Sequence, residues 1–287
     1  MRKVFYSIIC VVIFSLAGIF LLRADTFRVE KKEEIRKTLI FQDPSQPKDL
    51  QVDNIWGSIE VTGSAVDHVE LVAHKTIRAR TEGGLQKAEE EVTLDLTEEK
   101  NIIDIYVNGP FRDQNRSRER WHDPGYEVHY DFEIKVPRHT NILIKTVTDG
   151  DIQVTGIEGE FEVRNVNGKI RMEDVAGSGI AHTVNGGVRV SFTKNPESDC
   201  SFKTINGDIE VDFTKNLSAD FRLKSRFGDA YSDFPVSYLP ARKTATAERK
   251  SGKYVYKSNR FIDIRIGSGG PEIEMDTLNG DILINEK

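Results

Sequence analysis

Residues 146–172 read TVTDGDIQVTGIEGEFEVRNVNGKIRM and contain nearly the same pattern twice. Gly150 and Gly168 each follow a polar residue, and each has an apolar residue two and four places later. Strict alternation of apolar and polar residues is typical of a β-strand with one buried face. The stretch therefore predicts two strands that each begin just after a glycine turn.

The pattern recurs along the chain of 287 residues. Successive glycines are 18 residues apart at positions 150, 168 and 186, and 21 apart at 186, 207 and 228. The last of these fits less well, because Ala230 and Ser232 follow it. The predicted turn glycines are Gly57, Gly150, Gly168, Gly186, Gly207, Gly228 and Gly280.

The residues before the glycines also align. Five places before six of them stand Val52, Val163, Ala181, Phe202, Leu223 and Met275. Three places before stand small polar residues, namely Asn54, Asn165, Thr183, Thr204, Ser225 and Thr277. Such side chains bond neighbouring backbone groups, so we expect a column of hydroxyls and amides beside the turns.

These repeats predict an all-β fold, a β-solenoid or parallel β-helix-like stack of 18–21-residue coils. A unit this short cannot bury its own apolar face, whereas stacked units share one continuous core. Glycine suits each turn because a β-carbon would penalise the required backbone shape. The repetition therefore specifies shape.

The remaining sequence divides the chain into three parts. Residues 1–24 are a signal peptide or membrane anchor, and residues 25–137 form a more irregular N-terminal β region that caps or opens the solenoid. Residues 83–92, GGLQKAEEEV, are the one short helix expected there. Residues 138–287 form the solenoid, with an excursion at about 235–268 that contains a basic, proline-bearing stretch.

The N-terminus begins with two basic residues and continues with an uncharged stretch, residues 4–22. Its length is close to the roughly 20 residues that a helix needs to cross a bilayer. We favour a cleaved signal, with a retained anchor or, from Cys10, a lipoprotein as alternatives. Each places residues 25–287 outside the cytoplasm, in the periplasm, at the cell surface or anchored to the membrane.

Four segments of the chain carry a resemblance to a known family, namely VDNIWGSIEVTG, EIKVPRHTNILIKTVTDGDIQVTG, CSFKTINGDIEVDF and IEMDTLNGDILI. They are similar to a large bacterial family with β-strand repeats, whose domain of unknown function is labelled "putative adhesin". The resemblance covers roughly residues 50–287. It implies an exported, non-enzymatic β-solenoid and supplies no catalytic residues.

Charge and cysteine usage exclude several classes of protein. The net charge is −6, and residues 25–287 carry 37 basic and 46 acidic side chains, which argues against a nucleic-acid binder. Cys200 is alone outside the N-terminal segment, so no disulfide framework or thiolate metal cluster is possible, and we read it as a partly buried small residue. GSGG at residues 267–270 lacks a phosphate-binding context and is expected to bend the chain.

Some acidic residues could carry chemistry. If the coils stack, the aspartates beside the turn glycines form a row that could serve a polysaccharide-degrading enzyme or bind calcium. We favour turn formation and solvation. Likewise, His129 lies between Glu127 and Asp131 on one strand face, where a solvated strand is favoured over a metal site. We therefore expect no catalytic residue, cofactor or metal. The row of aspartates beside the turn glycines consists of Asp151, Asp208, Asp229 and Asp281.

Residues 111–126 form a polar, locally basic segment on an acidic chain. Arginine and tryptophan are common in binding hot spots, so this segment is a candidate surface patch, although a solvated, mobile loop is favoured over a binding role. The fold itself favours a binding or structural module of the cell envelope, in which the flat sheets present repeated side chains to an envelope protein or glycan. A membrane-tethered sensor is the alternative, and a polysaccharide-active enzyme comes third. The patch consists of Arg112, Arg116, Arg118, Arg120 and Trp121.

Overall fold

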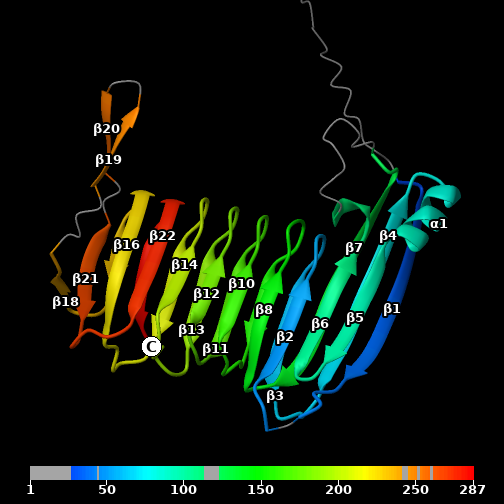
Figure 1. The fold of residues 1–287 in the computed structure, drawn as a ribbon, viewed down its shortest axis with the longest axis horizontal. Helices are drawn as coiled ribbons and strands as arrows, with labels where there is room; N and C mark the ends of the chain where they lie inside the picture. The colour runs from blue at the N-terminus through cyan, green and yellow to red at the C-terminus, as the bar shows by residue number, and fades with distance from the viewer. Residues whose placement is uncertain (1–26, 44, 113–122, 241–244, 251–252, 259–260) are drawn as a thin grey trace, which may run out of the picture.

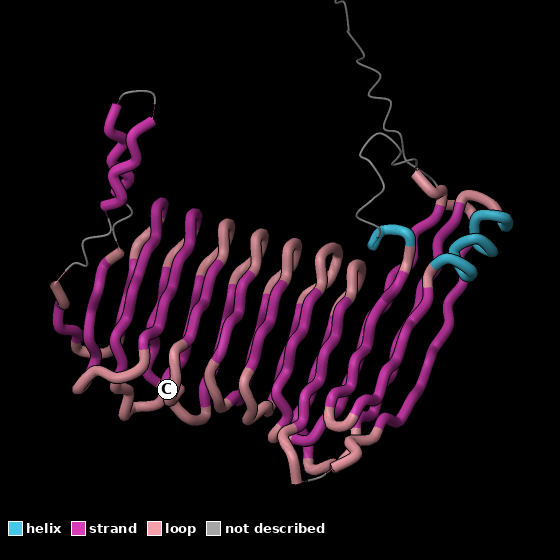
Figure 2. Tube along the Cα trace, viewed as in Figure 1, coloured by secondary structure: helices cyan, strands magenta, loops and turns pink. Residues whose placement is uncertain are grey.

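The computed structural model describes residues 27–43, 45–112, 123–240, 245–250, 253–258 and 261–287. Two long β-sheets lie face to face along the molecule and form a flattened stack of strands (Figures 1 and 2). The predicted fold class is therefore confirmed, because the chain is nearly all β and most strand pairs of the stack are parallel.

Each sheet contains strands from almost the whole length of the described chain. Sheet A contains, in spatial order, β1 (Val29–Leu39), β4 (Val69–Ala79), β7 (Tyr126–Pro137), β3 (Ile59–Ser64), β9 (Ile152–Thr155), β11 (Ile170–Val175), β13 (Val188–Phe192), β15 (Ile209–Phe213), β23 (Ile282–Glu286) and β17 (Ala230–Ser232). Sheet B contains β18 (Val236–Tyr238), β21 (Ile262–Ile266), β16 (Ala219–Phe227), β22 (Glu272–Asn279), β14 (Cys200–Lys203), β12 (Gly179–His182), β10 (Phe161–Arg164), β8 (Thr140–Lys145), β2 (Lys48–Asp53), β6 (Ile102–Asn108) and β5 (Thr93–Glu99).

One coil consists of a strand of sheet B, a glycine turn and a strand of sheet A. From β8 to β15 the coils follow one another in sequence order, and equivalent residues are paired between neighbouring coils. The turns lie along one long edge of the molecule, the upper edge in Figure 1, which we call the turn edge. The predicted alternation of strand, turn and strand is thus what builds the stack.

Spatial order departs from sequence order at both ends. The last coil in sequence, β22–β23, lies between the coils β14–β15 and β16–β17. At the other end, β6 and β7 lie outside β2 and β3. Antiparallel strands complete both ends, namely β1, β4 and β5 at the N-terminal end and β18 and β21 at the C-terminal end.

The core is the space between the two sheets. The residues two places after the turn glycines form a column in which each is at most 1% exposed, comprising Ile59, Ile152, Ile170, Val188, Ile209 and Ile282. Aromatic rings also pack in this core, where the Phe192 and Phe213 rings stack with centroids 5.4 Å apart. Val163, Phe202 and Met275 in sheet B are fully buried. Matching side chains therefore form columns through a shared dry interior.

The predicted helix exists as α1 (Glu82–Glu91), which packs beside β4 and β7. Thr81 caps it, since its hydroxyl accepts a hydrogen bond from the Gly84 amide at 3.1 Å. A short 3-10 helix, η1 (Pro110–Arg112), follows β6. Within the predicted excursion, β18 and β21 flank a hairpin of β19 (Ala245–Lys250) and β20 (Lys253–Ser258) that projects beyond the turn edge (Figure 1).

Candidate functional site

The small polar residues before the glycines bond from coil to coil. The Thr183 hydroxyl donates to the Gly168 carbonyl at 2.8 Å, and the Thr204 hydroxyl donates to the Gly186 carbonyl at 2.7 Å. The same bond is made by Asn165, Ser225 and Thr277 to the glycine carbonyl of the adjacent coil. The column of hydroxyls and amides expected from the sequence therefore satisfies turn carbonyls.

The glycines are required by the close approach of neighbouring turns. Gly207 has a φ of +152°, and a β-carbon placed there would lie 2.3 Å from the Gly186 carbonyl oxygen. Gly168, Gly186 and Gly280 meet the turn of the adjacent coil in the same way. The turn glycines thus set the spacing of the coils.

The turn aspartates also bond to the next coil. Asp151 accepts a hydrogen bond from the Lys169 amide at 2.7 Å, and Asp208 accepts one from the Asp281 amide at 2.8 Å. Asp281 accepts one from the Asp229 amide at 2.9 Å. The row of aspartates is not continuous, because Lys169 and Gly187 occupy the equivalent position after Gly168 and Gly186. In the part of the chain that the structure describes, no group of three or more His, Cys, Asp or Glu residues is placed to hold a metal ion.

Sequence reasoning overlooked two rows on the turn edge. The first is a ladder of amides, in which Asn185 donates to Asn167, Asn206 to Asn185 and Asn279 to Asn206, each at 2.7 Å. The second is an aliphatic row, partly or largely exposed, of Ile55, Val147, Val166, Val184, Ile205 and Leu278. The sequence contained a signal for both rows, because most of the glycine turns have the sequence apolar-Asn-Gly.

The Asn ladder and the aliphatic row form a flat, periodic strip. Ile205 is 43% exposed and Val166 is 36% exposed. The interior amides, Asn185 and Asn206, each use one N–H and one oxygen lone pair along the row, which leaves a second donor and acceptor for solvent or a ligand. The strip can therefore offer hydrogen bonds and apolar contacts side by side, repeated at the spacing of the coils.

Arg112, from the predicted basic patch, is held by the body of the protein. Its guanidinium pairs with the Asp53 carboxylate at 2.8 Å, donates to the Val107 carbonyl at 3.0 Å and lies 4.5 Å from the centre of the Tyr106 ring. Its side chain thereby ties η1 to sheet B. Arg116, Arg118, Arg120 and Trp121 lie outside the described residues, so the patch itself stays a prediction.

Charged side chains cover the outer faces of both sheets. On sheet B, Lys203 pairs with Glu274 at 2.9 Å, and on sheet A, Arg189 pairs with Glu210 at 3.1 Å. His182 lies among the sheet B side chains and contacts the Ser201 hydroxyl at 3.0 Å. Burial, reinforced by the positive charge of Lys203 nearby, lowers the pKa of His182 to about 4.

The other residues considered from the sequence have structural surroundings. Burial raises the pKa of the Cys200 thiol, so the reactive thiolate is disfavoured. Asp131 accepts hydrogen bonds from the amide and hydroxyl of Ser58, while His129 lies 3.7 Å from Glu127. The segment at residues 267–270 joins β21 to β22, and the Ser218 hydroxyl donates to the Gly269 carbonyl.

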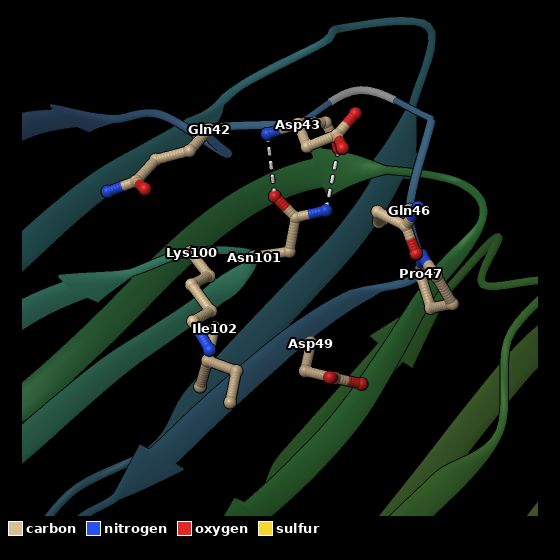
Figure 3. Close-up of a pocket in the computed structure, with 8 residues that line it drawn as sticks. All are labelled: Gln42, Asp43, Gln46, Pro47, Asp49, Lys100, Asn101 and Ile102. Atoms are coloured by element: carbon tan, nitrogen blue, oxygen red, sulfur yellow. Dashed lines mark hydrogen bonds between the residues drawn. The ribbon is translucent and has the colours of Figure 1, made fainter.

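A shallow hollow of about 510 Å³ lies at the opposite edge, near the N-terminal end (Figure 3). Asp43 and Asn101 face each other across it, and the Asp43 amide donates to the Asn101 side chain at 2.8 Å. Lys100, Asp49 and Ile102 complete much of its wall. Its polar groups bond largely to one another, so it is a weaker candidate for a binding site than the turn edge.

The segment predicted as a signal or anchor, residues 4–22, lies outside the described residues. From Phe27 onward, the described chain contains no helix long and apolar enough to cross a membrane.

Several solved structures of bacterial proteins are similar to this chain. A protein called a "putative cell adhesion protein" from Clostridium sporogenes shares 12% identity with a TM-score of 0.41, over 90% of this chain and 100% of its own. A "putative adhesin" from Bacteroides fragilis shares 11% with a TM-score of 0.39, over 89% and 97%. A "putative lipid binding protein" from Parabacteroides distasonis shares 10% with a TM-score of 0.26, over 89% and 96%.

No curated protein sequence matches this chain. The sequence profile of the Toastrack DUF4097 family matches residues 139–285, the run of coils from β8 to β23. The resemblance drawn from the sequence is thereby confirmed. Because the match spans half of the chain, the protein belongs to the Toastrack DUF4097 family.

Proposed function

We propose that this protein is an exported, non-enzymatic binding module of the bacterial cell envelope, and that the strip on its turn edge contacts the partner. The observation that carries the proposal is the pairing of the Asn ladder with the exposed aliphatic row on a rigid stack. Backbone and side-chain bonds fix every turn to its neighbours, so the strip binds without losing much conformational freedom.

The chemistry of the strip favours an extended, hydroxyl-rich partner such as an envelope glycan. Amide groups exchange hydrogen bonds with hydroxyls, while aliphatic side chains cover the apolar faces of sugar rings. A repeating polymer can engage several equivalent positions together, which multiplies weak contacts. An envelope protein with a flat polar surface is the alternative partner.

A binding array of envelope glycans and envelope proteins, probed with the full chain in mild detergent, tests the proposal. Replacing Val166 and Ile205 together by aspartate places charges on the strip without touching the core. We expect this double variant to lose at least about tenfold in affinity for the ligand that the wild type binds. Ile40→Asp is the matched control, since Ile40 is 61% exposed and lies away from the turn edge.

Equal binding by the double variant and the control would refute the turn edge as the binding surface. N-terminal sequencing of the mature protein tests export separately. A start after residue 24 supports a cleaved signal, whereas an intact N-terminus supports the tethered sensor.

A further inference from the structure

The two sheets end differently at the C-terminal end of the stack. Sheet A ends with β17. Sheet B continues beyond β16, the partner of β17 in the same coil, with β21 and β18 (Figure 1). The described residues supply no strand of sheet A opposite these two. We call β21 and β18 the overhang.

The overhang presents its core-side face to solvent. Ile262, Ile264 and Ile266 point to the core side because they pair with the buried core residues Leu223, Phe221 and Ala219 of β16. On the other side of β21, Ile264 pairs with Tyr238 and Ile266 with Val236. Paired residues of antiparallel strands share a face, so Val236 and Tyr238 also point to the core side. Even so, Val236 is 38% exposed, Tyr238 is 79% exposed and Ile262 is 52% exposed. This face is an unpartnered part of the core.

The N-terminal end is closed by contrast. Seven of the 11 residues of its edge strand β1 are charged, and β5 carries Asp95, Glu98 and Glu99. Charged edge strands prevent sheets from pairing with other chains. The edge strands β17 and β18 at the C-terminal end have no charged residue, and they carry Tyr231 and Tyr238 exposed to solvent. The two ends therefore differ in their capacity to associate.

We propose that the overhang is covered by the overhang of a second copy of this chain, in a twofold dimer joined at the C-terminal ends. The twofold axis runs parallel to the strands, so it exchanges sheet A and sheet B while strand directions are kept. Sheet A of each copy then continues into sheet B of the other. Both apolar faces are buried, and the arrangement is self-complementary, as a twofold interface must be.

Strand direction is compatible with this arrangement. β18 is antiparallel to β21, which is antiparallel to β16, so β18 and β16 run the same way. β17 follows β16 through a single turn and runs the opposite way. β18 of one copy and β17 of the other therefore meet as antiparallel edges, each three residues long. Such edges form the regular hydrogen-bond ladder of a sheet.

Light scattering on the full chain in mild detergent, with the detergent mass subtracted, measures the association. We expect a concentration-dependent dimer for the wild type. Ile262→Lys and Tyr238→Lys should each raise its dissociation constant roughly tenfold or more, with no loss of folded structure by circular dichroism. Ile40→Lys, at the other end, should leave the dimer intact. A wild type that stays monomeric at every concentration, or a dimer insensitive to both overhang variants, would overturn the proposal.

Disulfide trapping tests the geometry itself. Centre-to-centre pairing of the two edges places Tyr231 opposite Ser237 of the other copy, roughly 5 Å apart between Cα atoms, within reach of a disulfide. In a Cys10→Ser background, Tyr231→Cys combined with Ser237→Cys should form covalent dimers on oxidation, and neither single variant should. A mixture of the two single variants should cross-link as well. Cross-linking by one single variant alone would refute the twofold arrangement.

Discussion

Replacing Gly207 by alanine tests whether the turn glycines set the spacing between coils. A β-carbon at this position would lie 2.3 Å from the Gly186 carbonyl oxygen, and real β-carbons are essentially never closer than 3.0 Å to such an atom. The turn must therefore move by at least about 0.7 Å, while the Gly207 amide is hydrogen-bonded at 2.9 Å to the carbonyl of Asn279. The adjacent coils on both sides resist this movement.

The cost has two parts. Overpacking in a well-packed region costs about 1–3 kcal/mol. A non-glycine residue held at a strained positive φ costs about 1–2 kcal/mol more. We expect a loss of about 2–5 kcal/mol, which lowers the melting temperature of a chain of this size by roughly 5–15 °C. Thermal unfolding followed by circular dichroism measures this shift.

Gly83→Ala in α1 is the matched control, because a β-carbon there meets only the Thr81 hydroxyl at 4.0 Å. Alanine is the better helix former, so this variant should be as stable as the wild type or more stable by up to about 1 kcal/mol. If Gly207→Ala melted at the same temperature as Gly83→Ala, the argument from close turn approach would be wrong.

Three further variants probe the core, the turn column and the outer face. Ile209→Asp buries a charge at a fully buried position and should cost about 4 kcal/mol or more in chemical denaturation; a midpoint equal to the wild type would contradict its inward orientation. Thr204→Val keeps the shape but removes the donor to the Gly186 carbonyl, so a loss of about 1 kcal/mol is expected in the same assay, and an unchanged stability would show that the bond contributes nothing. His182 has its pKa lowered to about 4 in the folded protein, so the unfolded chain binds more protons between that value and its ordinary pKa near 6.5. Stability should fall by about 1–2 kcal/mol from pH 7 to pH 5 through this group, and His182→Gln should show a smaller fall than the wild type over the same pH series.

The coil pattern could be read from the sequence because each coil repeats the same local requirements. Ile152, Ile170 and Ile209 each stand two places after a turn glycine, and each of them faces the core. The polar residues three places before the glycine, such as Thr204, likewise make equivalent bonds in each coil. The local periodicity and the residues of the turns thus agree with the global fold, so the strands and the turns of each coil could be predicted.

The order of the coils could not be read in this way. β22–β23 has the same pattern as its neighbours, so nothing local distinguishes a place beyond β17 from a place beside β15. The turn aspartates were ambiguous for a related reason, since their partners are amides of the next coil. Asp208 bonds to the amide of Asp281, which is 73 residues away in sequence. Only the assembled stack reveals such pairs.

The placement of β22–β23 also governs when the solenoid can be completed. β16 pairs with β22 and β17 pairs with β23, so a chain growing from the ribosome holds the strands from residues 219–232 before their neighbours exist. A polypeptide halted before residue 272 leaves that coil without its inner support and leaves the edge of β14 and β15 open. Maturation of this end therefore waits for full-length synthesis, and a prematurely terminated product presents bare sheet edges that proteases and chaperones recognise.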